Sequence, residues 1–132
     1  MSDDPGGITP TLQQLLRHLL ETDGVVGGVL CSLDGLPLAA ALGGNLDEEG
    51  LAAAGARLGQ MASGCLGSDG LELAVMDATR LMIVVQPVAL GYLVVAAEPA
   101  GKIESAMAAA RRVGSALDQA AQTLTTPEPA WR

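Results

Sequence analysis

The sequence contains no phenylalanine, one tryptophan and one tyrosine. Its apolar share is nevertheless 49%, so a core must be built from leucine, valine, alanine and methionine. The 17 glycines, with this aliphatic set, favour close approach of helices and strands over the interlocking of bulky rings. A chain of 132 residues is long enough for one domain with a core of its own.

Basic residues are also scarce. Seven Lys and Arg side chains stand against fifteen Asp and Glu, for a formal net charge of −8. Binding to nucleic acid or adsorption to an anionic membrane depends on Lys and Arg facing phosphates, so we expect neither. No apolar run reaches the roughly 20 residues of a membrane helix. The first residues lack the basic and apolar segments of a signal peptide, so we expect a cytoplasmic protein without membrane insertion.

Groups that could carry catalysis or bind metal are few. His18 is the only histidine, and Cys31 and Cys65 are far apart and form no CxxC motif. The pattern indicates free thiols, with a disulfide or a reactive thiol as the alternatives. The P-loop, the dinucleotide fingerprint and the nucleophile elbow are all absent. The acidic residues 47–49 suit the start of a helix. We therefore expect no enzymatic activity, no metal and no cofactor.

The first half of the chain predicts a helix and a hairpin. Thr9 as N-cap and Pro10 at the first helical position begin a leucine-rich helix, and Gly24 is expected just past its end. Two apolar runs then flank an Asp-Gly pair at 34–35, which favours a type I′ turn and predicts a β-hairpin over 25–42. Because its first arm is apolar almost without a break, we expect it to be covered on both faces, with the hairpin central in the sheet.

A second helix is expected over 46–66. Asn45 and Glu48 have the spacing of a capping box, with Asn45 as the N-cap. One helical face is expected to lie on the sheet, and its members are Leu51, Ala54, Leu58, Met61, Ala62 and Cys65. The opposite face is small and weakly polar, where an ordinary exposed face would carry Lys and Glu. Small residues would let a second helix come close, although high alanine content for helix propensity alone is the alternative.

We predict that this small-residue face is a partner or dimer interface. The residues assigned to it are Glu49, Ala52, Ala53, Ala56, Arg57, Gln60 and Ser63.

The second half predicts three strands, over about 71–76, 80–86 and 90–96, and a long helix over 102–124. Asp77 is expected in a turn, and Pro87 at a turn or strand edge. We expect one domain over 9–124, with disordered tails at 1–8 and 125–132.

The order helix, hairpin, helix, three strands, helix accompanies a glycine-rich strand over 24–29 that leads into Ser32-Leu33-Asp34-Gly35-Leu36-Pro37-Leu38-Ala39. This combination resembles the roadblock / dynein light-chain family, in its prokaryotic GTPase-associated branch. The resemblance covers about residues 9–124. It implies a single α/β (α+β) domain of order α-β-β-α-β-β-β-α. A five-stranded antiparallel sheet would carry the second helix on one face and the other two on the opposite face.

The resemblance further implies a non-enzymatic homodimer that joins two sheets and sets the two second helices side by side. Its implied partner is a small Ras-like GTPase whose cycle it modulates. Two other functions stay open at this stage: a small-ligand-sensing α/β domain, and a scaffold subunit that pairs with a different roadblock chain. Stabilisation by a metabolite would favour the former, and an obligate heterodimer the latter.

Overall fold

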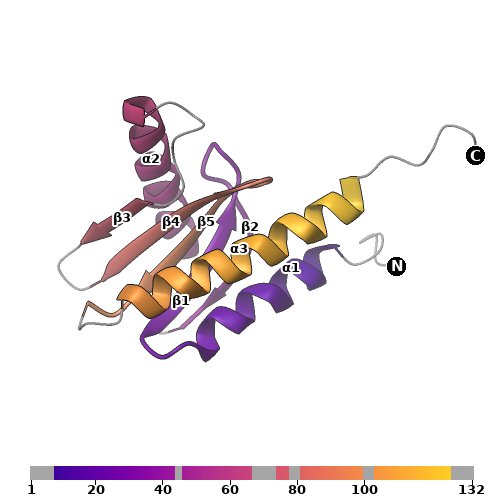
Figure 1. Ribbon diagram of the computed structural model, residues 1–132, viewed down its shortest axis with the longest axis horizontal. Helices are drawn as coiled ribbons and strands as arrows, with labels where there is room; N and C mark the ends of the chain where they lie inside the picture. Colours follow the sequence, from indigo (N-terminus) through magenta and orange to yellow (C-terminus); the bar gives the residue numbers. More distant parts are fainter. Residues whose placement is uncertain (1–7, 44–45, 67–73, 78–80, 100–102, 126–132) are drawn as a thin grey trace, which may run out of the picture.

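The computed structural model describes residues 8–43, 46–66, 74–77, 81–99 and 103–125, and it has the mixed α/β class predicted above (Figure 1). Its helices and strands follow the predicted order. In chain order they are α1 (Ile8–Arg17), the 3₁₀ helix η1 (His18–Glu21), β1 (Val25–Cys31), β2 (Pro37–Leu42), α2 (Glu48–Leu66), β3 (Ala74–Asp77), β4 (Met82–Val88), β5 (Gly91–Ala97) and α3 (Ile103–Thr125).

The strands form one antiparallel sheet of five in the order β2-β1-β5-β4-β3. Helix α2 covers one face, while α1 and α3 lie side by side on the other (Figure 1). Each face buries its own apolar cluster. Leu16, Leu93 and Leu117 belong to the α1–α3 side, and Val29 and Val94 to the α2 side. The sheet is therefore the middle layer of three. Successive side chains of a strand point to opposite faces, so a sheet that is apolar on both faces needs helices on both.

The predicted central position of the hairpin is wrong, because β5 is the middle strand and β2 is an edge strand. Every residue of β5 is buried, as expected for a strand paired on both sides and covered on both faces. Strand β2 alternates between buried and half-buried or exposed positions. The prediction that β1 is covered on both faces is confirmed, since residues 27–31 are all buried.

The turn predicted at Asp34-Gly35 is present, but it is not of type I′. Only Gly35 has a positive φ, of 89°, whereas type I′ requires positive φ at two central residues. The Gly35 N–H donates to the carbonyl of Ser32 at 2.9 Å, and the Ser32 N–H donates to the carbonyl of Leu36 at 2.9 Å. This longer loop places Cys31 opposite Pro37, with an irregular register at that point. In hairpins whose loop has three residues, the chain commonly makes a β-turn that leads into a glycine with positive φ, as it does here.

Several predicted helix ends are also corrected. Helix α1 begins at Ile8, so Thr9 is not its N-cap, and Pro10 falls within the first turn, where a missing N–H removes no intrahelical bond. The helical segment ends at Glu21, with Thr22 as C-cap. Gly24 therefore lies in the turn into β1, where its φ is 91°.

The predicted breaks in the second half of the sheet need two corrections. Asp77 belongs to β3 and pairs with Met82. Pro87 lies inside β4, opposite Tyr92. Among the described residues, β3 pairs with β4 between Met82 and Val85. The predicted strand segment 71–73 and the turn residues 78 and 79 lie outside the described residues.

The two sheet edges differ in how they are covered. On edge strand β2, the side-chain amide of Gln13 in α1 donates to the carbonyl of Ala40 and accepts from the N–H of Ala40. A side chain that occupies edge-strand backbone groups blocks pairing with another strand there. Strand β3 forms the other edge, and within the described residues no strand pairs with its outer side.

Candidate protein-interaction site

Helix α2 lies unusually close to the sheet because glycine faces the central strand. A Cβ built at Gly55 would lie 2.2 Å from Cγ2 of Val94, and one at Gly59 would lie 2.4 Å from Cε1 of Tyr92. Val94 and Tyr92 are buried residues of β5. Two glycines at i and i+4 share one face of a helix, so the backbone of α2 rests directly on these side chains.

The start of α2 is fixed by Asp47. Its Oδ2 accepts the Gly50 N–H at 3.0 Å, and its carbonyl accepts the Leu51 N–H at 2.9 Å. This is N-cap geometry, in which a side-chain oxygen satisfies an unpaired donor of the first turn. The predicted cap at Asn45 is therefore wrong, and Glu48 is the first helical residue. The conformation of Asn45 itself lies outside the described residues.

The predicted faces of α2 are partly reversed. Ala52 and Ala56, two of the predicted interface residues, are 0% and 4% exposed and pack on the sheet. Met61, assigned to the sheet, is 63% exposed, and Ala54 is half-buried. Small apolar residues lie on every side of the helix, so the sequence pattern alone does not distinguish the buried side. The structure places the smallest residues, glycine and alanine, against the bulky side chains of β5.

The other predicted interface residues lie at the surface or near it. Glu49, Ala53, Arg57 and Gln60 are exposed, and Ser63 is half-buried. The side-chain amide of Gln60 donates to the carbonyl of Leu33 at 2.6 Å, which joins α2 to the β1–β2 loop. Gly35 of that loop also lies against Ala53.

An apolar groove of about 400 Å³ runs along the exposed part of α2. It is lined by Ala53, Ala54, Arg57, Leu58 and Met61. At 100° per residue, Ala54, Leu58 and Met61 lie on the opposite side of the helix from the loop contacts at Ala56 and Gln60. Sequence reasoning found Ala53 and Arg57 and missed the other three. The signal that could have found them is the Gly55–Gly59 pair, which marks the sheet side and thereby the opposite one.

Within the described residues, no carboxylate lies within ion-pair distance of Arg57. The groove therefore offers an apolar surface with one guanidinium that has no ionic partner in the described part of the chain. That chemistry suits a protein partner, since Arg and Met are enriched at interfaces.

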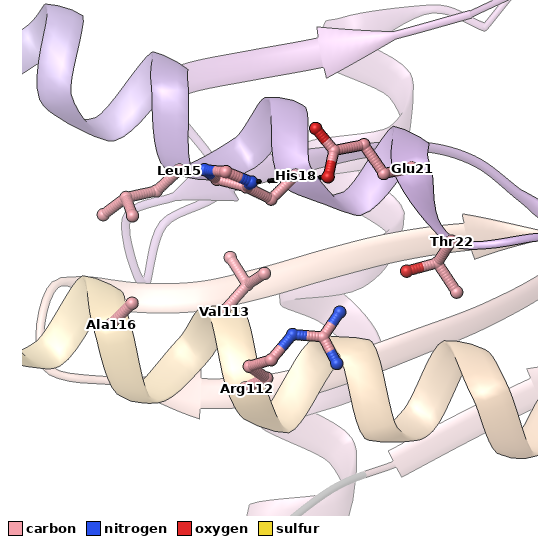
Figure 2. Close-up of a pocket in the computed structure, with 7 residues that line it drawn as sticks. All are labelled: Leu15, His18, Glu21, Thr22, Arg112, Val113 and Ala116. Atoms are coloured by element: carbon pink, nitrogen blue, oxygen red, sulfur yellow. Dashed lines mark ion pairs between the residues drawn. The ribbon is translucent and has the colours of Figure 1, made fainter.

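A second hollow, of about 410 Å³, lies between α1–η1 and α3 on the other face of the molecule. Its apolar part consists of Leu15, Val113 and Ala116. Its polar part consists of His18, Glu21, Thr22 and Arg112, with His18 and Arg112 coming from opposite walls (Figure 2). The His18 Nδ1 lies 3.6 Å from Oε1 of Glu21. Both of these side chains are exposed, so their pairing contributes little to stability.

The thiol of Cys31 is free and buried. Burial raises the pKa of the Cys31 thiol to about 11, although a hydrogen bond from the Tyr92 backbone lowers it in part. A thiol with so high a pKa is a poor nucleophile near neutral pH. No group of three or more His, Cys, Asp or Glu that could hold a metal ion occurs among the described residues. None of the described helices is long and apolar enough to cross a bilayer.

Comparison with known proteins adds the fold. The Roadblock/LC7 domain from Streptomyces avermitilis superposes with a TM-score of 0.69 and 17% identity, covering 81% of this chain and 94% of that one. The chain has the roadblock fold. No protein-family model and no curated protein sequence matches it, so the likeness is one of three-dimensional structure.

Two further roadblock-like structures show the same agreement. The gliding protein MglB from Thermus thermophilus superposes with a TM-score of 0.77 at 17% identity, covering 89% of this chain and 93% of that one. MglB from Myxococcus xanthus superposes with a TM-score of 0.68 at 14% identity, covering 98% of each chain. The superposed regions cover 89% and 98% of this chain, so the similarity in fold extends over most of the sequence given.

Proposed function

We propose that this chain is a non-enzymatic roadblock platform that forms a homodimer through α2 and β3 and binds a small Ras-like GTPase. The observation that carries the dimer is the apolar groove on α2. It lies on the exposed part of α2, and β3 is the sheet edge without a partner among the described strands. A two-fold axis at this edge would pair β3 with its copy and close both grooves against each other.

The small residues lining the groove support this arrangement. Ala53 and Ala54 leave room for the backbone of a second helix, while Met61 supplies a flexible apolar side chain that adapts to the facing surface. A self-complementary patch of this kind is what a two-fold dimer requires. Similar proteins assemble further, as one related structure is described as MglB with a tetrameric arrangement, at a TM-score of 0.75 and 18% identity.

The GTPase partner rests on the family resemblance in the hairpin sequence and on the roadblock fold. A surface made from both copies of α2 would present Glu49, Arg57 and Gln60 to the GTPase. Of the predicted interface residues, these are the exposed ones with polar side chains. Any effect on GTP hydrolysis would be indirect, through positioning of the GTPase switch regions.

The dimer is tested with Ala53→Arg and Met61→Glu, two changes at exposed groove positions. At low micromolar protein concentration, we expect wild type to scatter light with about twice the chain mass of 13.3 kDa, and both variants to scatter as monomers with unchanged circular dichroism. Ala108→Arg, at an exposed position of α3, is the matched control and should stay dimeric. A monomeric wild type, or dimeric groove variants, would refute the proposed dimer.

The GTPase partner is tested separately, by pull-down with the small Ras-like GTPase encoded nearest to the gene of this protein. We expect the wild type to bind it, and Glu49→Arg, at an exposed position that does not line the groove, to bind at least about tenfold more weakly, because reversal of an exposed interface charge turns attraction into repulsion. A wild-type dimer that binds no such GTPase in either nucleotide state would leave the dimer standing and refute the partner.

A further inference from the structure

Exposed leucine is concentrated in one short segment of the surface. Leu33 is 58% exposed and Leu36 is 64% exposed, and both lie in the loop between β1 and β2; Leu38 follows at the start of β2 and is also exposed. An apolar cluster left in water at one point of a domain surface indicates a contact surface. We refer to the loop residues 33–36 as the knob.

The knob is held in one conformation by the rest of the chain. Besides the two backbone bonds of its turn, the Leu36 N–H donates to Oγ of Ser32 at 3.1 Å. The carbonyl of Leu33 accepts from Gln60 on α2, and Gly35 lies 3.4 Å from Ala53, measured from a built Cβ to Cα. Because these contacts already order the loop, little conformational entropy remains to be lost when it binds.

The pocket between α1–η1 and α3 has the complementary chemistry. Its apolar part would receive leucine side chains, and Arg112 stands at its rim (Figure 2). The knob carries Asp34, which is exposed, between its two leucines. Among the residues that line the pocket, Glu21 is the carboxylate, and His18 lies beside it. The guanidinium of Arg112 is therefore the group expected to pair with an acidic side chain that enters the pocket.

We propose that the knob of one copy of this chain docks into the α1–α3 pocket of another copy. Leu33 and Leu36 contact Leu15, Val113 and Ala116, and Asp34 pairs with Arg112. The knob touches α2, whereas the pocket lies on the opposite face of the sheet, so one chain cannot fill its own pocket.

The contact is head-to-tail, because each copy contributes a different surface. Such a contact leaves one free knob and one free pocket at the ends and can therefore continue beyond two copies. The surface of one loop is well below the roughly 1,000 Å² of a stable interface, so the association is weak and depends on concentration. It does not involve the α2 groove and does not rest on the proposed GTPase function.

The experiment is sedimentation of the full chain from micromolar to millimolar concentration. The knob variant is Leu33→Ser with Leu36→Ser, and the pocket variant is Arg112→Glu. Arg111→Glu is the matched control, because Arg111 is an exposed neighbour on α3 that does not line the pocket. We expect the average mass of wild type and of the control to rise with concentration. The knob and pocket variants should need at least about tenfold more protein for the same rise.

Mixing provides the decisive result. In the Met61→Glu background, where the α2 groove is blocked, the knob variant keeps an intact pocket and the pocket variant keeps an intact knob, so a mixture should regain one contact and stop growing there. The double variant Asp34→Arg with Arg112→Glu should restore the rise of average mass with protein concentration. A wild-type mass independent of concentration, a knob variant that grows like wild type, or a mixture that regains nothing would overturn the proposal.

The same series in the Met61→Glu background separates this contact from the α2 dimer. In that background the average mass should still rise with protein concentration, even though the groove is blocked. If growth disappears together with the dimer, the knob–pocket contact is refuted while the proposed dimer stands. If Met61→Glu leaves the dimer intact and growth persists, the dimer is refuted and the knob–pocket contact stands.

Discussion

Gly55→Ala should destabilise this protein, although alanine is the better helix former. In the middle of a helix the exchange of Gly for Ala stabilises by about 1 kcal/mol through propensity. Here the new methyl carbon would lie 2.2, 2.7 and 3.0 Å from Cγ2, Cγ1 and Cβ of Val94. Rotation of the valine cannot remove all three contacts, because Cβ itself is among them. Val94 is fully buried in the middle strand of the sheet, so α2 must move away from β5.

Overpacking a buried site by one methyl group costs about 1–3 kcal/mol. The rigid valine places this site near the upper end, so we expect a net loss of about 1–2 kcal/mol after the propensity term is subtracted. For a chain of this length that corresponds to a fall in Tm of roughly 3–8 °C. Thermal unfolding followed by circular dichroism at one fixed protein concentration measures it, since dimerisation would make Tm depend on concentration.

Gly64→Ala on the same helix is the matched control. Among the described residues, no atom lies within 4 Å of a Cβ built at Gly64, so only the propensity term remains, and we expect Tm to stay or rise slightly. The double variant Gly55→Ala with Val94→Ala should show less than the sum of the two single losses, because the smaller residue vacates the contested space. If Gly55→Ala raises Tm as Gly64→Ala does, the close seating of α2 on β5 is incorrect.

Three further predictions follow from single contacts. Asp47→Ala should lower the free energy of unfolding by about 1 kcal/mol in a denaturant titration, because the Gly50 N–H loses its acceptor, and Asp47→Asn should retain most of it; equal losses would contradict the cap. Gly35→Ala should lower it by about 1–2 kcal/mol, because Gly35 has a φ of 89°, whereas Asp34→Ala, with no positive φ, should lose less. The contribution of Cys31 to the free energy of unfolding should be fully present below about pH 9 and be lost as the pH rises toward 11, because burial raises the pKa of Cys31 to about 11 and the unfolded thiol ionises first; Cys31→Ala should weaken this fall, and an unchanged pH profile would contradict it.

Local patterns in the sequence determined the elements of this fold and their order. Apolar runs bounded by Gly, Pro or Asp-Gly mark the strands, and leucine spacing marks α1, because strand and helix periods leave different signatures in adjacent residues. Family resemblance in the hairpin then extended these elements to a roadblock topology. The resemblance succeeds because an Asp-Gly loop and a glycine-containing strand are short-range features that survive where overall identity is low.

The tertiary structure alone decided which strand is central and which side of α2 is free. Strand order depends on the pairing of β1 with β5, residues about 65 positions apart in the chain, and no local pattern encodes that partner. The orientation of α2 depends on Gly55 and Gly59 fitting over Val94 and Tyr92. Since alanine, leucine and methionine lie all around this helix, its own sequence distinguishes its sides poorly. The bulky residues of β5 select the glycine side by steric fit, and the apolar groove at Met61 is the consequence.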